Sequence, residues 1–225
     1  MPSIRSFVVS ILPAALFLSL ACSLSIQTGF AGAPVAETAE DIEPLLAGEA
    51  APRFTVQTVN DEDFVFDPQA LERPAIIITF RGGWCPYCNL HLSELRHVVP
   101  EIDELGVDVL FLSGDRPELL FESLDADTQS DIDGLGYTIL SDANANAALA
   151  FGIAFKAPER YLEMLPEHGV DIDASSMDRH GVLPVPAVYA VDRAGEIAFA
   201  FVEADYKVRL PADELLAVAK DMAAN

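Results

Sequence analysis

The sequence predicts an α/β fold with a mixed central sheet, helices on both faces of that sheet and a β-hairpin at its N-terminal end. From residue 75 onward, short apolar segments rich in β-branched residues alternate with helical patterns, an order typical of parallel β-α-β units. Two later apolar segments, 187–191 and 196–202, are joined by a short turn and predict antiparallel strands. Together these patterns indicate one sheet with both parallel and antiparallel strands.

Composition supports a globular domain and excludes two classes of partner. The chain has 225 residues, of which 51% are hydrophobic, and this apolar fraction is too high for a disordered chain. Its formal charge of −23, from 13 Lys+Arg against 36 Asp+Glu, argues against binding to nucleic acid or to anionic membrane surfaces. Three cysteines are too few for a disulfide-stapled scaffold.

Residues 1–33 predict a secretion signal peptide. Arg5 supplies a positive charge, a mostly apolar run over 7–20 follows, and small residues end the segment. A retained membrane anchor is one alternative. A lipid anchor at Cys22 is another, although Ser19 stands where a lipid-attachment motif has an aliphatic residue. Export predicts an extracytoplasmic, periplasmic location, where disulfides can form.

Residues 34–46 predict a linker, and residues 47–225 predict the folded domain. The predicted elements are, in order, a hairpin over 54–59 and 64–66, a buried strand over 75–80, a helix over 88–105 kinked at Pro100, a strand over 107–112, a helix over 116–124 with Asp115 as N-cap, a strand over 137–140, a helix over 143–151 capped by Asp142, a hairpin over 187–191 and 196–202, and a helix over 211–223. Residues 156–184 lack periodicity and predict an excursion with one helix.

A Cys-x-x-Cys motif lies where the strand over 75–80 leads into the next helix. Cysteines at this spacing on a helix start lie close enough to form a disulfide. Cys85 is expected to be exposed at the positive end of the helix dipole, which favours its thiolate and makes it the nucleophile. Cys88, one turn inside the helix, is expected to resolve the mixed disulfide.

Three neighbours of the cysteines are expected to shape the site. Trp84 can shield the thiolate, and Pro86 suits a first helical turn because it has no N–H group to satisfy. Arg81 can lower the pKa of Cys85, since a nearby cation stabilises a thiolate; capping the sheet edge is the alternative role for this arginine.

Other interpretations of the cysteine pair are half of a zinc site or a structural disulfide. No second Cys-x-x-Cys exists, so a zinc site would need His91 and distant histidines. His91 is better explained as a helix-surface or core residue. Four soft or imidazole donors in the excursion suit copper but have no regular spacing; they are Met164, His168, Met177 and His180.

The segment Phe-Arg-Gly-Gly-Trp-Cys-Pro-Tyr-Cys over 80–88 resembles the active site of thioredoxin-fold proteins. From about residue 48 to 219 the chain is similar to the peroxiredoxin-like branch of the alkyl hydroperoxide reductase/thiol-specific antioxidant (AhpC/TSA) family. The opening Gly-x-x-Ala-Pro-x-Phe over 48–54 and the Val-Asp-Arg-Ala-Gly turn over 191–195 support this resemblance. It implies a thioredoxin-like fold, an antioxidant oxidoreductase, a redox disulfide between Cys85 and Cys88, and no cofactor or metal.

The resemblance also implies a cis-proline that faces the cysteines and precedes a strand. Pro186 matches this position, with Pro184 as a competing candidate, and the backbone of Val185 would then pair with the substrate. Two positions depart from the related patterns. Gly82 stands where peroxiredoxins have a hydroxyl residue that orients the peroxide, and Thr79 stands where thioredoxins have a buried acid.

The function expected from these features is that of an exported thiol–disulfide oxidoreductase. Its substrates would be protein or small-molecule thiols and disulfides, with hydroperoxides as further candidates. The alternatives are a thiol-dependent peroxidase, a copper- or metal-delivery protein that uses His91 or His180, and a redox-inactive binding module. Arg209, in the pattern Asp-Tyr-x-x-Arg over 205–209, can reach the site, but a solvated loop arginine is the simpler expectation.

Overall fold

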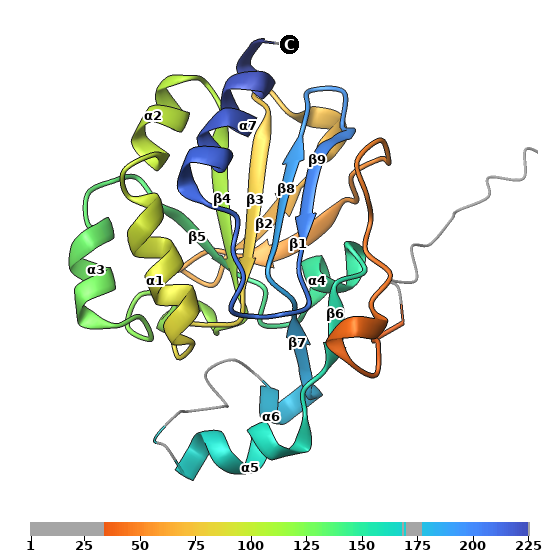
Figure 1. The fold of residues 1–225 in the computed structure, drawn as a ribbon, viewed down its shortest axis with the longest axis vertical. Coiled ribbons are helices and arrows are strands. Elements are labelled where there is room, and N and C mark those ends of the chain that lie inside the picture. The colour runs from red at the N-terminus through yellow and green to blue at the C-terminus, as the bar shows by residue number, and fades with distance from the viewer. Residues whose placement is uncertain (1–33, 168, 170–176, 225) are drawn as a thin grey trace, which may run out of the picture. The chain divides into compact units, whose positions relative to one another are not determined.

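The computed structural model describes residues 34–167, 169 and 177–224 (Figure 1). Its main sheet has seven strands in the order β2-β1-β5-β4-β3-β8-β9. The strands are β1 (Phe54–Gln57), β2 (Asp63–Phe66), β3 (Ala75–Phe80), β4 (Asp108–Ser113), β5 (Thr138–Ser141), β8 (Ala187–Val191) and β9 (Ile197–Val202). Strands β3, β4 and β5 are parallel, whereas β1–β2, β1–β5, β3–β8 and β8–β9 pair antiparallel. The predicted mixed sheet with an N-terminal hairpin is therefore confirmed.

Strand β3 is the centre of the fold, and all six of its residues are buried. Ile76 and Ile78 point into one core together with Cys85 and Cys88, while Ile77 points into a second core on the other face. A strand that buries both faces needs side chains that are apolar throughout, which explains its continuous run of β-branched residues.

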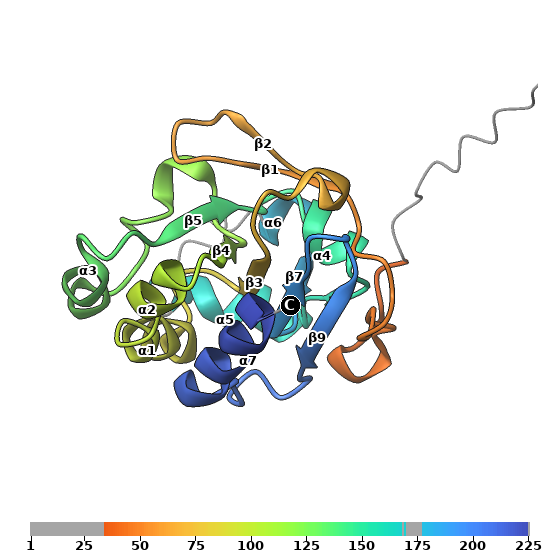
Figure 2. The same ribbon diagram turned by 90° about the horizontal axis from the view of Figure 1, so that it is seen from above.

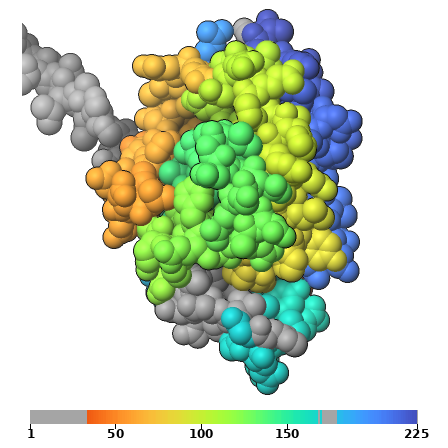
Figure 3. Space-filling view, turned by 90° about the vertical axis from the view of Figure 1, so that its left-hand side faces the viewer, coloured from red at the N-terminus to blue at the C-terminus, as the bar shows by residue number. Residues whose placement is uncertain are grey.

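Helices cover both faces, as predicted (Figures 1 and 2). The α-helices are α1 (Pro86–Leu95), α2 (Val99–Glu104), α3 (Ala126–Ile132), α4 (Asn146–Ala150), α5 (Glu159–Glu167), α6 (Met177–His180) and α7 (Ala212–Ala224). Side chains of α1, α2, α3 and α7 belong to the core that contains the cysteines, and those of α4 and α5 belong to the other core. The space-filling view shows the segments of α1–α3, yellow to green, as a continuous layer beside the hairpin (Figure 3).

Two predicted helices differ from the structure. The helix over 88–105 is broken rather than kinked, because α1 ends at Leu95 and α2 starts anew with Pro100 in its first turn. The segment 116–124 contains only a 3₁₀ helix, η3 (Pro117–Leu119), and α3 follows it unpredicted. Asp115 does not cap a helix there, since its carboxylate binds other groups described below. Asp142 does cap α4, accepting the N–H groups of Ala147 and Ala148 at 2.9 Å each.

The segment 34–46, predicted as a linker, packs on the domain instead. Ala36 exchanges backbone hydrogen bonds with β6 (Ala154–Lys156), and Leu45 donates its N–H to Phe151. Four apolar side chains of this segment lie against the core: Ala36, Ala39, Ile42 and Leu45. Their spacing of three residues differs from the periods of an α-helix and a strand, so those periods did not reveal the contact; the segment includes the 3₁₀ helix η1 (Ala39–Asp41).

The excursion over 156–184 contains two helices, α5 and α6, rather than one. Its ends are joined by an antiparallel pair, β6 with β7 (Val182–Pro184). The predicted signal peptide lies outside the described residues. Within those residues, no helix combines the length and the apolar character needed to cross a bilayer.

Candidate active site

The two cysteines lie at the junction of β3 and α1, where the sequence placed them. Cys85 is the N-cap of α1, Pro86 occupies its first turn, and Cys88 follows one turn later. Both are free thiols. Contrary to expectation, Cys85 is only 2% exposed and Cys88 only 1%, because the helix start packs into the core rather than facing solvent.

The loop before Cys85 is held by Asp115, at the end of β4. Its Oδ2 accepts hydrogen bonds from the Gly83 N–H at 2.7 Å, the Ser123 hydroxyl at 2.7 Å and the Ser113 hydroxyl at 3.1 Å. Asp115 is fully buried, and this burial raises the pKa of its carboxyl group despite the three donors. Sequence reasoning missed this role because the local pattern before Pro117 resembles a helix start.

The backbone conformation at Gly82 and its close neighbours explain why no hydroxyl residue occupies the position three residues before Cys85. Its φ of +147° is one that residues with a side chain rarely adopt. A Cβ atom at this position would lie 2.5 Å from Oδ1 of Asp115 and 2.6 Å from Nε1 of Trp84. A threonine or serine would therefore collide with both groups.

Asn89 also stabilises the loop before Cys85. The sequence analysis did not identify this residue. This buried side chain donates to the Cys85 carbonyl at 3.2 Å and accepts the N–H of Asp125 at 2.9 Å. It thereby ties the start of α1 to the segment that leads into α3. A buried asparagine one residue after the motif is the only signal that the sequence offers for it.

The charge nearest to the sulfurs comes from Arg209, in the connection between β9 and α7. Its Nη2 donates to Sγ of Cys88 across 3.5 Å. Burial alone would raise the pKa of Cys88. The hydrogen bond from the Cys85 thiol, the Arg209 guanidinium and the backbone N–H of Arg81 together lower that pKa to about 7.

The neighbouring Cys88 and burial raise the pKa of Cys85. Its hydrogen bond with Cys88, its burial and the negative charge of the Cys88 thiolate all favour the neutral thiol. The helix start alone favours the thiolate on Cys85, whereas the directions of these two pKa shifts favour it on Cys88.

Arg81 contributes to the site differently from the prediction. The guanidinium whose charge lowers the pKa of both cysteines belongs to Arg209. Arg81 contributes its backbone N–H to Cys88, while its guanidinium lies 4.5 Å from the centre of the Tyr206 ring. Trp84 is half-buried and packs against both cores, a position compatible with shielding the sulfurs.

The predicted cis-proline is absent, since the described residues contain no cis peptide bond. Pro186 is buried and directly precedes β8. Val185 cannot pair with a substrate in this conformation: it is 0% exposed, its N–H donates to Ile153 at 3.0 Å and its carbonyl accepts from Thr79. Thr79 donates to Val185 at 3.1 Å and accepts the Ala187 N–H at 3.0 Å, so its hydroxyl bridges the backbone around the proline.

His91 and His180, the two histidines weighed as metal ligands, are occupied by structural contacts. His91 is a buried core residue whose Nε2 lies 3.1 Å from the Leu210 carbonyl. His180 contacts the Ala143 carbonyl through Nε2 and accepts the Val182 N–H at Nδ1. Over 34–167, 169 and 177–224, no group of three His, Cys, Asp or Glu side chains has metal-binding geometry. His168 and the side chain of Met177, part of the predicted copper set, lie outside the described residues.

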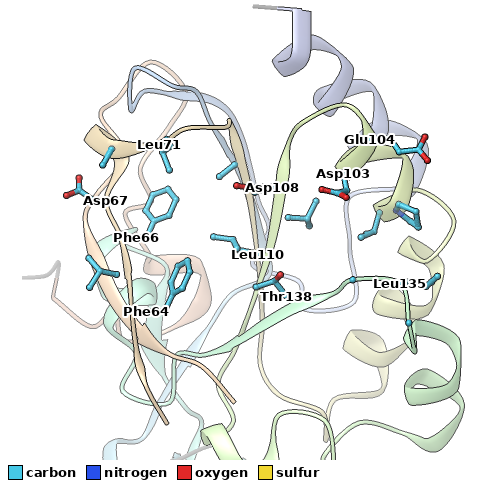
Figure 4. A pocket seen from close by; sticks show the side chains of 18 residues that line it. Phe64, Phe66, Asp67, Leu71, Asp103, Glu104, Asp108, Leu110, Leu135 and Thr138 are labelled. Carbon is cyan, nitrogen blue, oxygen red and sulfur yellow. The ribbon is translucent and has the colours of Figure 1, made fainter. Parts of the chain in front are cut away.

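A cleft of about 710 Å³ lies at the other end of the sheet (Figure 4). Phe64 of β2 and Leu110 of β4 line it, and Asp103 and Glu104 of α2 lie at its rim. The cleft is near the first residues of β3 and β4, whereas the cysteines follow the last residue of β3. No residue of the predicted site lines it.

Comparison with known proteins identifies the family of this chain. Residues 47–200 match the model of the AhpC/TSA family. The thiol-disulfide oxidoreductase ResA of Halalkalibacterium halodurans is 27% identical over 123 residues, which cover 55% of this chain and 64% of that protein. The peroxiredoxin Bcp of Escherichia coli K12 is 28% identical over 112 residues, which cover 50% and 67%.

Solved structures agree on the fold. A peroxiredoxin-like protein from Aquifex aeolicus superposes with a TM-score of 0.57 at 18% identity, covering 80% of this chain and 89% of that one. Reduced Prx3 from Vibrio vulnificus, in complex with H₂O₂, gives a TM-score of 0.58 at 15% identity, covering 78% and 99%. Because the family match spans more than half of the sequence and includes both cysteines, the chain belongs to the AhpC/TSA family and has its thioredoxin-like fold.

Proposed function

We propose that this protein is an exported thiol–disulfide oxidoreductase whose Cys85 and Cys88 cycle between a dithiol and a disulfide. The observation that carries the proposal is the pair of free, buried thiols at the start of α1, with the Arg209 guanidinium donating to the sulfur of Cys88. Both relatives described above have the name of an oxidoreductase or a peroxiredoxin, which supports the same class of chemistry.

The proposed cycle begins with a proton transfer within the pair. Cys85 passes its proton to the Cys88 thiolate and attacks one sulfur of a substrate disulfide, RSSR. A Cys85–SR bond forms, the substrate S–S bond breaks, and RS⁻ leaves. Cys88 then passes the proton to this leaving group, attacks the sulfur of Cys85 and releases the second RS⁻. The substrate gains two electrons, and the two cysteines lose them as their disulfide forms.

Arg209 supports the second half of this cycle. A thiol with a pKa of about 7 is half ionised at neutral pH, so Cys88 can lose its proton again without a strong base. Low pKa also makes a sulfur a good leaving group, which favours reopening of the disulfide by a reductant. The pair is therefore suited to exchange in both directions.

Disulfides suit this site better than hydroperoxides. Efficient reduction of a peroxide needs polar groups that hold it in line with the attacking sulfur, and Gly82 offers no hydroxyl for this. A thiol-dependent peroxidase is the second candidate function, favoured by the similarity to Bcp. Export is proposed from the charge, apolar run and small residues of segment 1–33.

The test is turnover of 2-hydroxyethyl disulfide by the processed protein, compared with its Cys85→Ser and Cys88→Ser variants. We expect Cys85→Ser to abolish the first step and Cys88→Ser to accumulate a mixed disulfide, seen by mass spectrometry as one added substrate half. A wild-type protein that leaves the disulfide intact would contradict the proposed function. A mixed disulfide on Cys88 in the Cys85→Ser variant would instead reverse the two roles.

A further inference from the structure

Cations gather on the aromatic rings around Arg81 and at the sulfur of Cys88, in a chain whose net charge is −23. Elsewhere, six basic residues form ion pairs with carboxylates: Arg53, Arg73, Arg96, Arg116, Lys156 and Lys220. Four others have no ion pair within the described residues and lie on aromatic rings or sulfur near the site: Arg81, Arg160, Lys207 and Arg209. Such a local excess of positive charge attracts anions despite the overall charge.

Arg81 is the most unusual of the four because it is 4% exposed and forms no hydrogen bond or ion pair through its guanidinium with any described residue. The ring centres of Tyr206, Phe155 and Tyr161 lie 4.5, 5.7 and 5.9 Å from its Cζ. Aromatic faces offset only part of the cost of burying a cation. The guanidinium thus keeps its hydrogen-bond donors available for a ligand.

Tyr206 links this cation to the start of α1, which carries the cysteines. Tyr206 covers Arg81 on one side and contacts Tyr87, the residue between Pro86 and Cys88, with ring centres 5.6 Å apart. Arg209 donates to the Tyr206 carbonyl and, through its other nitrogen, to Cys88. The connection that carries Tyr206 and Arg209 runs past the end of β3 between β9 and α7 (Figure 1).

The acidic side chains of that connection do not neutralise the cations. The carboxylate of Glu203 accepts the N–H of Asp205, and the carboxylate of Asp205 accepts the N–H of Lys207. Neither forms an ion pair with Arg81 or Arg209 in the described part of the chain. An anion brought by the substrate would supply the missing counter-charge.

We propose that Arg81 binds the carboxylate of the substrate and that the preferred substrate is the disulfide of a small, carboxylate-bearing thiol. This inference rests on the proposed function and specifies its substrate class. A planar guanidinium matches a carboxylate with two parallel hydrogen bonds. The ligand is small because Arg81 and both sulfurs are nearly inaccessible, so a broad protein surface does not reach them.

The overall reaction is balanced by the two cysteines alone. One disulfide RSSR and the two protein thiols yield two RSH and the Cys85–Cys88 disulfide. The carboxylate does not react; its ion pair with Arg81 holds the nearer substrate sulfur against Cys85. Loss of this ion pair is therefore expected mainly to raise KM for carboxylate-bearing disulfides.

The test compares three disulfides that differ in end group: 3,3′-dithiodipropionate, 2-hydroxyethyl disulfide and cystamine, which are anionic, neutral and cationic. Each rate constant is divided by that of dithiothreitol with the same disulfide, which removes differences between the leaving thiols. We expect the wild-type protein to prefer the anionic compound over the neutral one by about tenfold or more, as for a hydrogen bond between charged groups.

Arg81→Met keeps the length of the side chain and its contact with the rings but removes the charge. It should raise KM for dithiodipropionate and abolish the preference for the anionic disulfide over the neutral one. Its melting temperature should be equal or higher, because a buried unpaired charge is removed. Arg53→Met, which removes an exposed cation paired with Asp67, is the matched control and should keep the preference.

Equal normalised rates for the anionic and neutral disulfides in the wild type, or an unchanged preference in Arg81→Met, would overturn the inference while leaving the proposed function intact. Absence of reaction with all three disulfides would instead refute the proposed function itself.

Discussion

The guanidinium of Arg209 donates a hydrogen bond to the sulfur of Cys88 although 121 residues separate them in sequence. The contact brings the connection before α7 to the start of α1. It places the positive charge of Arg209 beside the second cysteine of the motif rather than the first. Arg209 thereby helps to lower the pKa of Cys88, whereas the neighbouring Cys88 and burial raise the pKa of Cys85.

Arg209→Met should raise the lower pKa of the cysteine pair from about 7 by about one pH unit or more, because a nearby cation stabilises the thiolate. The measurement is the rate of alkylation by iodoacetamide as a function of pH. Arg53→Met, which removes a cation far along the sequence from both cysteines, serves as the control and should leave the profile in place. An unshifted profile in Arg209→Met would show that its charge does not stabilise the thiolate.

Gly82→Ala should destabilise the protein by about 2–4 kcal/mol, since both its backbone conformation and its new Cβ are unfavourable. Gly106→Ala is a matched control: its φ is +79°, but a Cβ there would meet no atom within 4 Å. It should cost only about 1 kcal/mol, from the backbone alone. Urea unfolding of the three proteins gives the comparison, and equal losses would mean that the loop yields to the new methyl group.

His91 should make the protein less stable in mild acid. Burial, aided by the charge of Arg209, lowers its pKa to about 4, below the 6.5 of an exposed histidine. The unfolded chain therefore binds a proton before the folded one does. The contribution of His91 to the free energy of unfolding is complete above pH 6.5. It falls by about 3 kcal/mol as the pH drops to 4.

His91→Gln keeps a donor for the Leu210 carbonyl but does not titrate. The difference in unfolding free energy between wild type and this variant should change over pH 6.5 to 4, as measured by denaturant titration. A difference that is constant across this range would exclude His91 as the source of acid sensitivity.

The processed chain should begin between Gly32 and Glu37, because the apolar run and the small residues precede that window. Mass spectrometry of the protein recovered from the producing cells gives its first residue. A chain that starts at a lipid-modified Cys22 would contradict this prediction and favour the anchored alternative.

The sequence predicted the elements that depend on local apolar patterns. Strands β3 and β8 are buried runs and β9 is a largely half-buried apolar run; turns mark their limits, so their positions could be found without the structure. The strand–motif–helix arrangement of Cys85 and Cys88 followed from the same local signals. These features need no knowledge of distant contacts.

The parts that failed depend on contacts between distant segments. Burial of Cys85 arises when the start of α1 packs into the core, and the role of Arg209 arises when the connection over 203–211 meets α1. Asp115 resembles a helix cap locally, but its carboxylate binds Gly83, which lies 32 residues earlier. Val185 was expected to bind substrate, yet the neighbouring strand already satisfies its carbonyl through Thr79.

The most direct test of the account is single-turnover oxidation of the reduced protein in a stopped-flow instrument, with 2-hydroxyethyl disulfide in one series and hydrogen peroxide in the other. We expect complete oxidation by the disulfide through Cys85, with a slower reaction toward peroxide. A Cys85-dependent peroxide step at about 10⁵ M⁻¹s⁻¹ or above, which is in the range of efficient enzymes, combined with a slower disulfide reaction would contradict it and establish peroxide reduction as the primary activity.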